Sequence, residues 1–317
     1  MTECFVGFDT SNYTTSVAVC SANGEVVANL KMPLSVREGE RGLRQSDAVF
    51  AHTKNLPVLL EQLGGVLREE RLHPIGVGVS TRPRDAEGSY MPCFLAGKSA
   101  AYAFGAAANL PVREFAHQNG HVMAALYSCG KQESLRAQPF LAFHVSGGTT
   151  EALFARPEER GFSLTLVGET DDINAGQLID RIGVAMGLSF PCGKEMEALA
   201  SAYQGKIHRH PVCVRDTRCS LSGAENIAMK LWRESGDGQA VAAFVFDFVC
   251  RTLLKMGEQL EEQYGKLPMV FAGGVMSNEW MRKRLSSAFD ASFSEPAFSA
   301  DNAAGIALLA REALLQN

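Results

Sequence analysis

The sequence predicts an α/β protein with a duplicated domain. Two segments of similar pattern, 4–20 (CFVGFDTSNYTTSVAVC) and 140–155 (FLAFHVSGGTTEALFA), start about 136 residues apart. Each joins two β-prone apolar runs through a turn of small polar residues, which is typical of a β-hairpin. A chain of 317 residues is long enough for two domains, so the repeated hairpins indicate a duplication.

Composition and charge predict a soluble, cytoplasmic protein. Hydrophobic residues make up 46% of the chain, yet the longest apolar run, AVAAFVFDFVC, carries Asp247, so we expect no membrane span. The first residues, MTECFVGFD, contain acids in place of the basic stretch of a signal peptide. Eight cysteines occur without a CxxC pair, which favours small reduced core residues.

Three basic runs are candidates for contacts with nucleic acid. They are 37–44 (REGERGLR), 206–218 (KIHRHPVCVRDTR) and 281–284 (MRKR). The formal net charge of −5 argues against nonspecific coating of nucleic acid, because neutralising phosphates needs a concentrated basic surface. A local patch that binds nucleic acid stays open, and so does the simpler interpretation that these runs are solvated faces.

Small residues at three turns suit the binding of a ligand, and at the two hairpin turns they suit phosphate. The turns of both hairpins expose backbone N–H groups and add hydroxyls. A third segment, 269–285, is predicted as a buried strand, a Gly-Gly turn and a helix that directs Trp280, Met281 and Leu285 to the core. Glycine at a strand end lets a ligand approach the backbone. The alternatives are that the turns only reverse the chain and that Asn278 is an ordinary helix N-cap.

Further helices are predicted in the second half of the chain. The first follows Asp171, Asp172 and Asn174, has its apolar repeat at Leu178, Ile182, Ala185 and Met186, and ends at Gly187. Asp180 lies off that apolar stripe, so it can face solvent or a ligand. The turn PCGK precedes another helix, from Glu195, and a long helix spans about 239–264.

Two histidines four residues apart, His117 and His121, are a candidate metal site. In a helix this spacing places both imidazoles on one face. A zinc-protease HExxH motif is excluded because Gln118 occupies the position of the glutamate. A third ligand must come from elsewhere, and the candidate is Asp301 in FSADNAAGIALLA. The alternatives are a core histidine for the pair and an N-cap for Asp301.

These motifs, in this order, resemble those of the bacterial TsaD family, the tRNA threonylcarbamoyladenosine synthases. The similar segments are GFDTS (7–11), HQNGH (117–121), VSGGTT (145–150), AGQLID (175–180) with PCGK (191–194), AGGVMSN (272–278) and ADNAAGIA (300–307). They cover nearly the whole chain in colinear order.

The resemblance implies an ASKHA fold, the actin and hexokinase architecture of two ribonuclease-H-like domains around a nucleotide cleft. Residues 1–115 plus 296–317 would form the first domain and 116–295 the second. It implies a divalent metal, iron or zinc with magnesium as the alternative, on His117, His121 and Asp301, and catalytic roles for Asp9 and Asn12. ATP, ADP or an acyl-adenylate would be held by Val145, Ser146, Gly147, Gly148, Thr149, Asp180, Gly193, Gly274 and Asn278.

The implied reaction is metal-dependent transfer of a threonylcarbamoyl group from threonylcarbamoyl-AMP to the adenosine next to the anticodon of tRNA. In acyl transfer from a mixed anhydride AMP leaves readily, so the enzyme mainly orients the carbonyl and stabilises developing charge. The implied partners are an adenine nucleotide, tRNA and accessory protein subunits, with a homodimer as a further expectation.

Several positions depart from the family pattern. Asn12 and Tyr13 replace a cysteine and an acid, Thr149 replaces a histidine, Gln177 a glutamate and Cys192 a glycine. The segment 80–93 (STRPRDAEGSYMPC) is bulkier than the glycine-rich stretch of the family. This pattern favours a paralogue that keeps the acyl-adenylate chemistry and changes its acceptor or partner. The alternatives are a carbamoyltransferase with another acceptor and a nucleotide-binding regulatory or scaffolding subunit.

Overall fold

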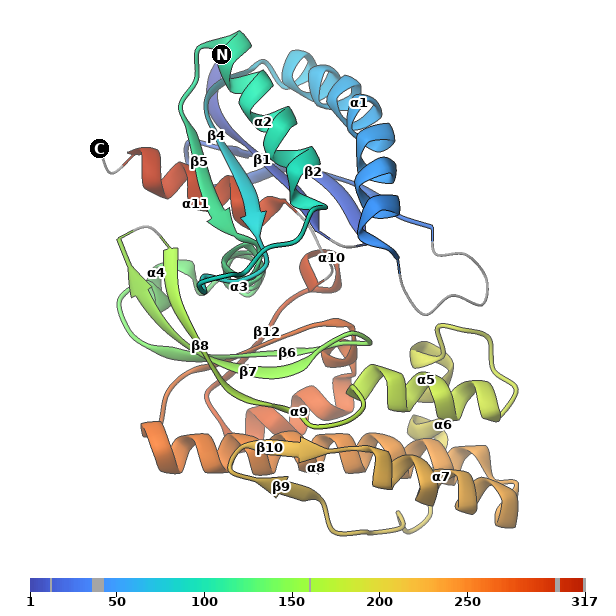
Figure 1. The fold of residues 1–317 in the computed structure, drawn as a ribbon. Helices are drawn as coiled ribbons and strands as arrows, with labels where there is room; N and C mark the ends of the chain where they lie inside the picture. The colour runs from blue at the N-terminus through green and yellow to red at the C-terminus, as the bar shows by residue number, and fades with distance from the viewer. Residues whose placement is uncertain (12, 36–42, 160, 300–302, 316–317) are drawn as a thin grey trace. The chain divides into compact units, whose positions relative to one another are not determined.

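The computed structural model describes residues 1–11, 13–35, 43–159, 161–299 and 303–315, which fold into two units (Figure 1). Unit 1 comprises Met1–Arg136, Pro157–Leu164 and Ala297–Asn317, and unit 2 comprises Ala137–Arg156 and Thr165–Pro296. The sequence predicted that the first segment of unit 1 ends at residue 115, whereas in the structure it ends at Arg136. The two helices between these positions, His117–Ser128 and Gln132–Leu135, pack within unit 1.

Unit 1 is built on a five-stranded sheet. Its elements are β1 (Thr2–Ser11), β2 (Thr14–Ser21), β3 (Val26–Pro33), α1 (Gln45–Glu69), β4 (Leu72–Arg82), α2 (Phe94–Ala108), β5 (Val112–Ala116), α3 (His117–Ser128), α4 (Gln132–Leu135), α10 (Pro296–Ser299) and α11 (Ala304–Leu315). The strand order is β3-β2-β1-β4-β5. β1, β2 and β3 form an antiparallel meander, and β4 and β5 extend the sheet in parallel from β1.

The two faces of this sheet carry different residues. On β1, Cys4, Val6 and Phe8 are fully buried in a cluster with residues of α1 and α2. Because side chains alternate along a strand, Gly7 faces the opposite way. A Cβ on Gly7 would lie 2.5 Å from the carbonyl oxygen of Ala303, at the start of α11. Glycine therefore lets α11 lie directly on the sheet.

The helices α3 and α11 cross with their backbones in contact. A Cβ added to Gly305 would lie 1.8 Å from the carbonyl oxygen of Gly120, and one added to Gly120 would lie 2.8 Å from Ile306 Cδ1. No side chain fits between the two helices at this point. The position of α3 is thus set by the main chain of α11.

The second sheet has seven strands and repeats the topology of the first. Its elements are β6 (Phe140–Val145), β7 (Thr150–Glu158), β8 (Gly161–Thr170), α5 (Ala175–Ala185), α6 (Gly193–Ala202), β9 (Cys213–Arg215), β10 (Arg218–Ser220), α7 (Ser222–Ser235), α8 (Gly238–Tyr264), β11 (Met269–Ala272), the 3₁₀ turn η1 (Gly274–Ser277), α9 (Glu279–Ala288) and β12 (Ala291–Phe293). The strand order is β12-β11-β6-β7-β8-β10-β9. From β8 to β12 this is again a three-strand meander followed by two parallel strands, so the predicted duplication is confirmed.

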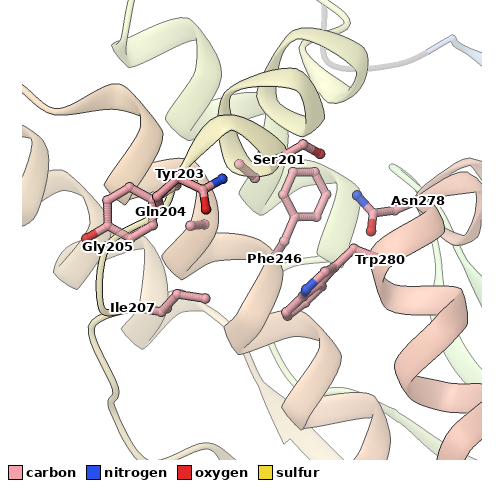
Figure 2. A pocket seen from close by; sticks show the side chains of 10 residues that line it. Ser201, Tyr203, Gln204, Gly205, Ile207, Phe246, Asn278 and Trp280 are labelled. Carbon is pink, nitrogen blue, oxygen red and sulfur yellow. The ribbon is translucent and has the colours of Figure 1, made fainter.

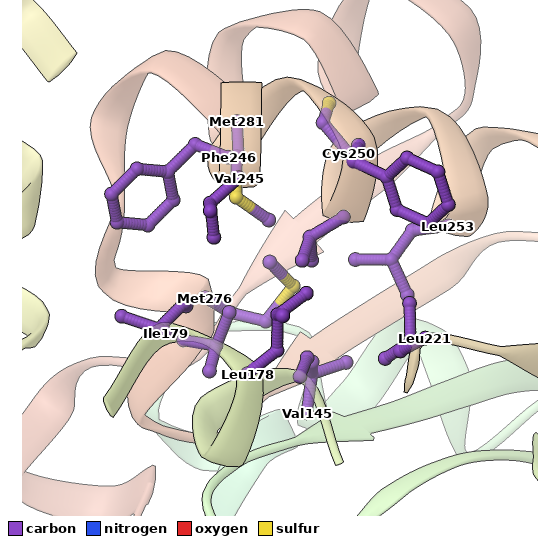
Figure 3. Close-up of a cluster of buried hydrophobic side chains, with 14 of the residues drawn as sticks. Val145, Leu178, Ile179, Leu221, Val245, Phe246, Cys250, Leu253, Met276 and Met281 are labelled. Carbon is purple, nitrogen blue, oxygen red and sulfur yellow. The ribbon is translucent and has the colours of Figure 1, made fainter. Parts of the chain in front are cut away.

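The core of unit 2 lies between the sheet and the helices α5, α8 and α9 (Figure 3). Val145, Leu178 and Met281 are fully buried in it. The apolar repeat of α5 was only partly right, since Leu178 and Ile182 are buried whereas Ala185 is exposed. The prediction that Trp280 faces the core was wrong, because 38% of its surface is exposed.

The remaining sequence-based expectations concern helix bounds, cysteines and membranes. The long helix occurs at Gly238–Tyr264, and α6 begins at Gly193, two residues before the expected Glu195. All eight cysteines, each within the described residues, are free thiols, and six of them are buried. No helix within the described ranges is long and apolar enough to cross a bilayer.

The crossing of α3 and α11 generates a stability prediction. Gly305→Ala should lower the free energy of unfolding by about 3 kcal/mol, because the new methyl group overlaps the main chain of Gly120. Urea denaturation measures this loss.

The matched control is Gly65→Ala near the C-terminal end of α1, where an added Cβ meets no atom within 4 Å. It should raise stability by about 0.5–1 kcal/mol, the helix propensity of alanine over glycine. Equal effects of the two substitutions would refute the proposed contact.

Candidate functional site

The histidine pair lies at the junction of β5 and α3. β5 ends at Ala116 and α3 begins at His117, so both histidines fall in its first five residues. Their ring centroids are 4.3 Å apart with the planes nearly perpendicular. The rings thus lie side by side on one face of α3, as the spacing predicted.

His117 contacts a buried carboxylate at the end of β1. Its Nδ1 lies 2.9 Å from Oδ1 of Asp9, whose side chain is completely buried. Asp9 also accepts hydrogen bonds from the hydroxyls of Ser80 and Ser11. Burial opposes ionisation of Asp9, but the charge and hydrogen bond of His117 and the two hydroxyls outweigh it and keep the pKa of Asp9 below its ordinary value.

The donor set suits a metal that prefers nitrogen. Two imidazoles favour iron or zinc over magnesium, which prefers oxygen ligands. A carboxylate on Nδ1 of a histidine is the usual support for ligation through the other ring nitrogen. The predicted ligand Asp301 and the predicted catalytic Asn12 lie outside the described residues. Among the residues that are described, no three His, Cys, Asp or Glu side chains are grouped so as to hold a metal ion.

The predicted phosphate turn joins β6 to β7. The hydroxyl of Ser146 accepts from the backbone N–H groups of Gly148 and Thr149, at 3.3 and 3.1 Å. The carbonyl of Ser146 accepts from the N–H of Gly176 at the start of α5. The turn is therefore stabilised by the Ser146 hydroxyl within it and by the first residues of α5 next to it.

A pocket of about 420 Å³ in unit 2 collects five of the predicted nucleotide-binding residues. Its lining includes Gly147, Asp180, Gly193, Gly274 and Asn278. The other four predicted residues, Val145, Ser146, Gly148 and Thr149, belong to the turn and are not part of the lining. This volume lies within the range of about 300–1,000 Å³ typical of small-molecule sites.

The glycines around this pocket are of two kinds. A Cβ added to Gly147, Gly193 or Gly274 would meet no atom within 4 Å. By contrast, a Cβ on Gly176 would lie 2.6 Å from the nitrogen of Gly147, and one on Gly273 would lie 2.2 Å from the carbonyl oxygen of Val145. The second kind is required by packing. The first kind borders open space, so packing alone does not explain why these positions are glycine.

Two departures from the family pattern have structural explanations. Gln177 completes a capping box with Asn174, since its Oε1 accepts from the Asn174 N–H at 3.0 Å. Cys192 is fully buried against Gly183, whose missing side chain makes room for the thiol. The backbone N–H of Cys192 donates to Oδ1 of Asp180 at 2.8 Å. Burial raises the pKa of Asp180, and this hydrogen bond opposes the rise.

Asn278 caps α9, as the simpler interpretation held, and it also lines the pocket. Its Oδ1 accepts from the N–H of Met281 at 2.9 Å. The same pocket is also lined by Lys194, Ile179 and Phe246, none of which was predicted from the sequence to bind a ligand. Lys194 stands inside the quoted PCGK turn and is a cation beside the predicted Gly193, a signal that could have identified it.

Comparison with known proteins identifies the relatives of this chain. A model of the TsaD family, described as tRNA N6-adenosine threonylcarbamoyltransferase, matches residues 45–308. A protein named tRNA N6-adenosine threonylcarbamoyltransferase from Streptococcus pneumoniae (strain CGSP14) is 30% identical over 297 residues, which is 89% of this chain and 83% of that protein.

Solved structures share the fold at low identity. T. kodakarensis HypF aligns with a TM-score of 0.63 and 11% identity over 99% of this chain and 48% of its own. The activator of the 2-hydroxyisocaproyl-CoA dehydratase from Clostridium difficile, with bound ADPNP, aligns with a TM-score of 0.56 and 13% identity, over 99% of this chain and 96% of its own. Together with the repeated sheet topology, these likenesses confirm the predicted ASKHA fold.

The two kinds of glycine predict different effects of an added methyl group on stability. Gly176→Ala should lower the free energy of unfolding by about 1–3 kcal/mol, because the methyl group meets the backbone of Gly147. Gly147→Ala and Gly274→Ala should change it by less than about 0.5 kcal/mol. Urea denaturation of the three variants tests this, and a large loss in Gly147→Ala would show that packing requires that glycine.

Proposed function

This chain belongs to the TsaD family of transferases, and from that membership we propose that it transfers a threonylcarbamoyl group from threonylcarbamoyl-AMP to the adenosine next to the anticodon of tRNA. The observation that carries the proposal is the pocket of unit 2, where three glycines border open space beside Lys194 and the carboxylates of Asp180 and Glu197. Such a lining suits a ligand that bears both phosphate and hydroxyl groups.

The nucleotide part of the donor is proposed to lie in this pocket. Gly147 and Gly274 let phosphate oxygens approach the backbone, and Lys194 supplies a positive charge at the N-terminal end of α6. Oδ1 of Asp180 is taken by Cys192, so Oδ2 is proposed to accept from a ribose hydroxyl. Since the Asn278 oxygen caps α9, its Nδ2 is proposed to donate to the nucleotide.

A metal ion is proposed to be held by His117, His121 and Asp301. Nε2 is the proposed ligating atom of His117, because Nδ1 contacts Asp9. When bound, such an ion supplies Lewis-acid stabilisation of negative charge on an acyl phosphate.

Asp9 is proposed to orient His117 instead of contacting substrate. Its carboxylate is completely buried and occupied by Ser80, Ser11 and His117. An ionised Asp9 also favours the His117 tautomer that carries its proton on Nδ1 and keeps Nε2 as a donor to the metal.

The metal proposal predicts a loss of bound metal. Purified wild-type protein should carry iron or zinc near one equivalent, and His117→Ala and His121→Ala should lose it, because each removes an imidazole ligand. Asp9→Asn should weaken metal affinity about 10–100-fold, the usual effect of changing a group that orients a ligand.

Elemental analysis after dialysis measures the metal content. The control is His73→Ala, which removes an exposed histidine of β4 and should leave the metal unchanged. Full metal content in His117→Ala would remove His117 from the site.

The transfer proposal predicts a modified nucleoside. Wild-type protein given threonylcarbamoyl-AMP, unmodified tRNA and the accessory proteins of its host should form threonylcarbamoyladenosine and release AMP. Gly147→Ala should lower the affinity for ATP at least tenfold without loss of stability, because its methyl group enters the proposed phosphate space. Nucleoside mass spectrometry and calorimetry measure the two effects.

The outcomes separate the alternatives. Absence of the nucleoside with all partners present would contradict the proposal. AMP release from carbamoyl-AMP with a small acceptor, in place of threonylcarbamoyl transfer, would identify a carbamoyltransferase. ATP binding without any turnover would identify a regulatory subunit.

A further inference from the structure

Two basic segments of unit 2 contain no acidic residue. Residues 198–215 include Lys206, Arg209 and Arg215 and contain no Asp or Glu. Residues 280–289 include Lys283 and Arg284 and also contain no acidic residue. Lys206, Arg209 and Lys283 are exposed. In a chain with a net charge of −5, this is a local concentration of positive charge.

The helix α8 brings these segments together. Nη1 of Arg251 donates to the carbonyl of His210 at 2.9 Å, and the ring of His208 lies 5.5 Å from that of Phe244. These contacts fix the first segment along α8.

A buried carboxylate on α8 fixes the second segment. Asp247 is 1% exposed and accepts from Nε of Arg251 at 2.6 Å and from Nη1 of Arg284, on α9, at 2.7 Å. One carboxylate thus balances two guanidinium groups. The cluster retains a net positive charge between the two basic segments.

An aromatic pocket of about 220 Å³ lies among these elements (Figure 2). Tyr203 and Ile207 line it on the side of the first segment, and Phe246 and Trp280 line it on the side of α8 and α9. Trp280 is partly exposed, and the guanidinium of Arg284 stacks over its ring at 4.7 Å. The pocket is smaller than the roughly 300 Å³ at which small-molecule sites begin, so it suits one planar ring better than a whole nucleotide.

We propose that this face of unit 2 binds RNA, with phosphates on the two basic segments and one unstacked base against Trp280. The inference rests on the proposed function, in which tRNA is the acceptor, and it names a surface that contacts the acceptor. Recognition of single-stranded RNA loops combines basic side chains with bases stacked on aromatic rings and guanidinium planes. This surface offers both.

A competing occupant is the base of a nucleotide bound in the larger pocket, since Phe246 and Asn278 line both pockets. The two basic segments favour RNA, because a single nucleotide cannot extend over charges spread along two segments. The experiment must therefore compare binding of RNA with binding of ATP.

The experiment measures the affinity of the full chain for an unmodified tRNA transcript, without acyl donor, over a range of salt concentrations. Trp280→Ala should weaken binding about tenfold or more, as expected when one stacked base is released. Trp280→Phe should retain most of the affinity, since it keeps an aromatic face. The double variant Lys206→Ala with Arg209→Ala should reduce the slope of log affinity against log salt by about 1–2.

The control is Lys266→Ala, an exposed lysine just after α8 and about 27 Å along the helix from Phe246. It should leave both affinity and slope unchanged. Affinity for ATP should be unchanged in Trp280→Ala and in the double variant.

The outcomes distinguish this inference from the proposed function. Unchanged RNA affinity in Trp280→Ala and in the double variant would overturn the inference, even if threonylcarbamoyl transfer occurs. Weakened ATP binding with unchanged RNA binding in Trp280→Ala would also overturn it and assign the pocket to the nucleotide base. Loss of RNA binding in these variants of a protein that transfers no acyl group would support the surface and refute the proposed reaction.

Discussion

The contact between the backbones of Gly120 and Gly305 is the constraint on which the histidine site depends. Gly120 directly precedes His121, so the place where α3 touches α11 is also the place where α3 presents its imidazoles. On the other side of α11, Gly7 and Gly78 let the same helix lie on β1 and β4. α11 is therefore fixed by main-chain contacts on two sides. Replacing any of these four glycines by a residue with a Cβ would move the histidines relative to Asp9.

A similar use of glycine holds the turn of unit 2, with a different result. Gly176 and Gly273 bring α5 and the end of β11 against the main chain of residues 145–147, while the neighbouring Gly147 and Gly274 border the pocket. Backbone contacts fix the turn from two directions and leave its pocket side free of side chains. Rigidity and open space thus come from adjacent glycines, and the buried apolar core beneath them keeps the helices in place (Figure 3).

Local features of the site could be predicted from the sequence, because they depend on neighbouring residues. The two hairpins, the histidine pair and the Asn278 cap each follow from residues within a few positions of one another. Contacts between distant residues could not be predicted this way. The hydrogen bond from His117 to Asp9 joins residues 108 positions apart, and the ion pair of Arg284 with Asp247 joins residues 37 apart. Trp280 was misplaced because a hydrophobic pattern does not show that the first turn of α9 borders a pocket. The sequence also cannot distinguish a glycine required by packing from one that borders open space.

The position of α11 at the end of the sequence affects the order in which the two units fold. Unit 1 begins with the first strand of the chain, yet the helix that lies on its glycine face comes after all of unit 2 has been synthesised. Domains usually fold on the ribosome in the order in which they emerge. Here unit 1 cannot complete its fold until α11 has been synthesised, and until then the glycine face of β1 and β4 is uncovered. Unit 2 does not need α11 to complete its core. Unit 2 is thus expected to be the first to complete its fold, and a released chain truncated before residue 303 should hold a folded second unit and an unfinished first one.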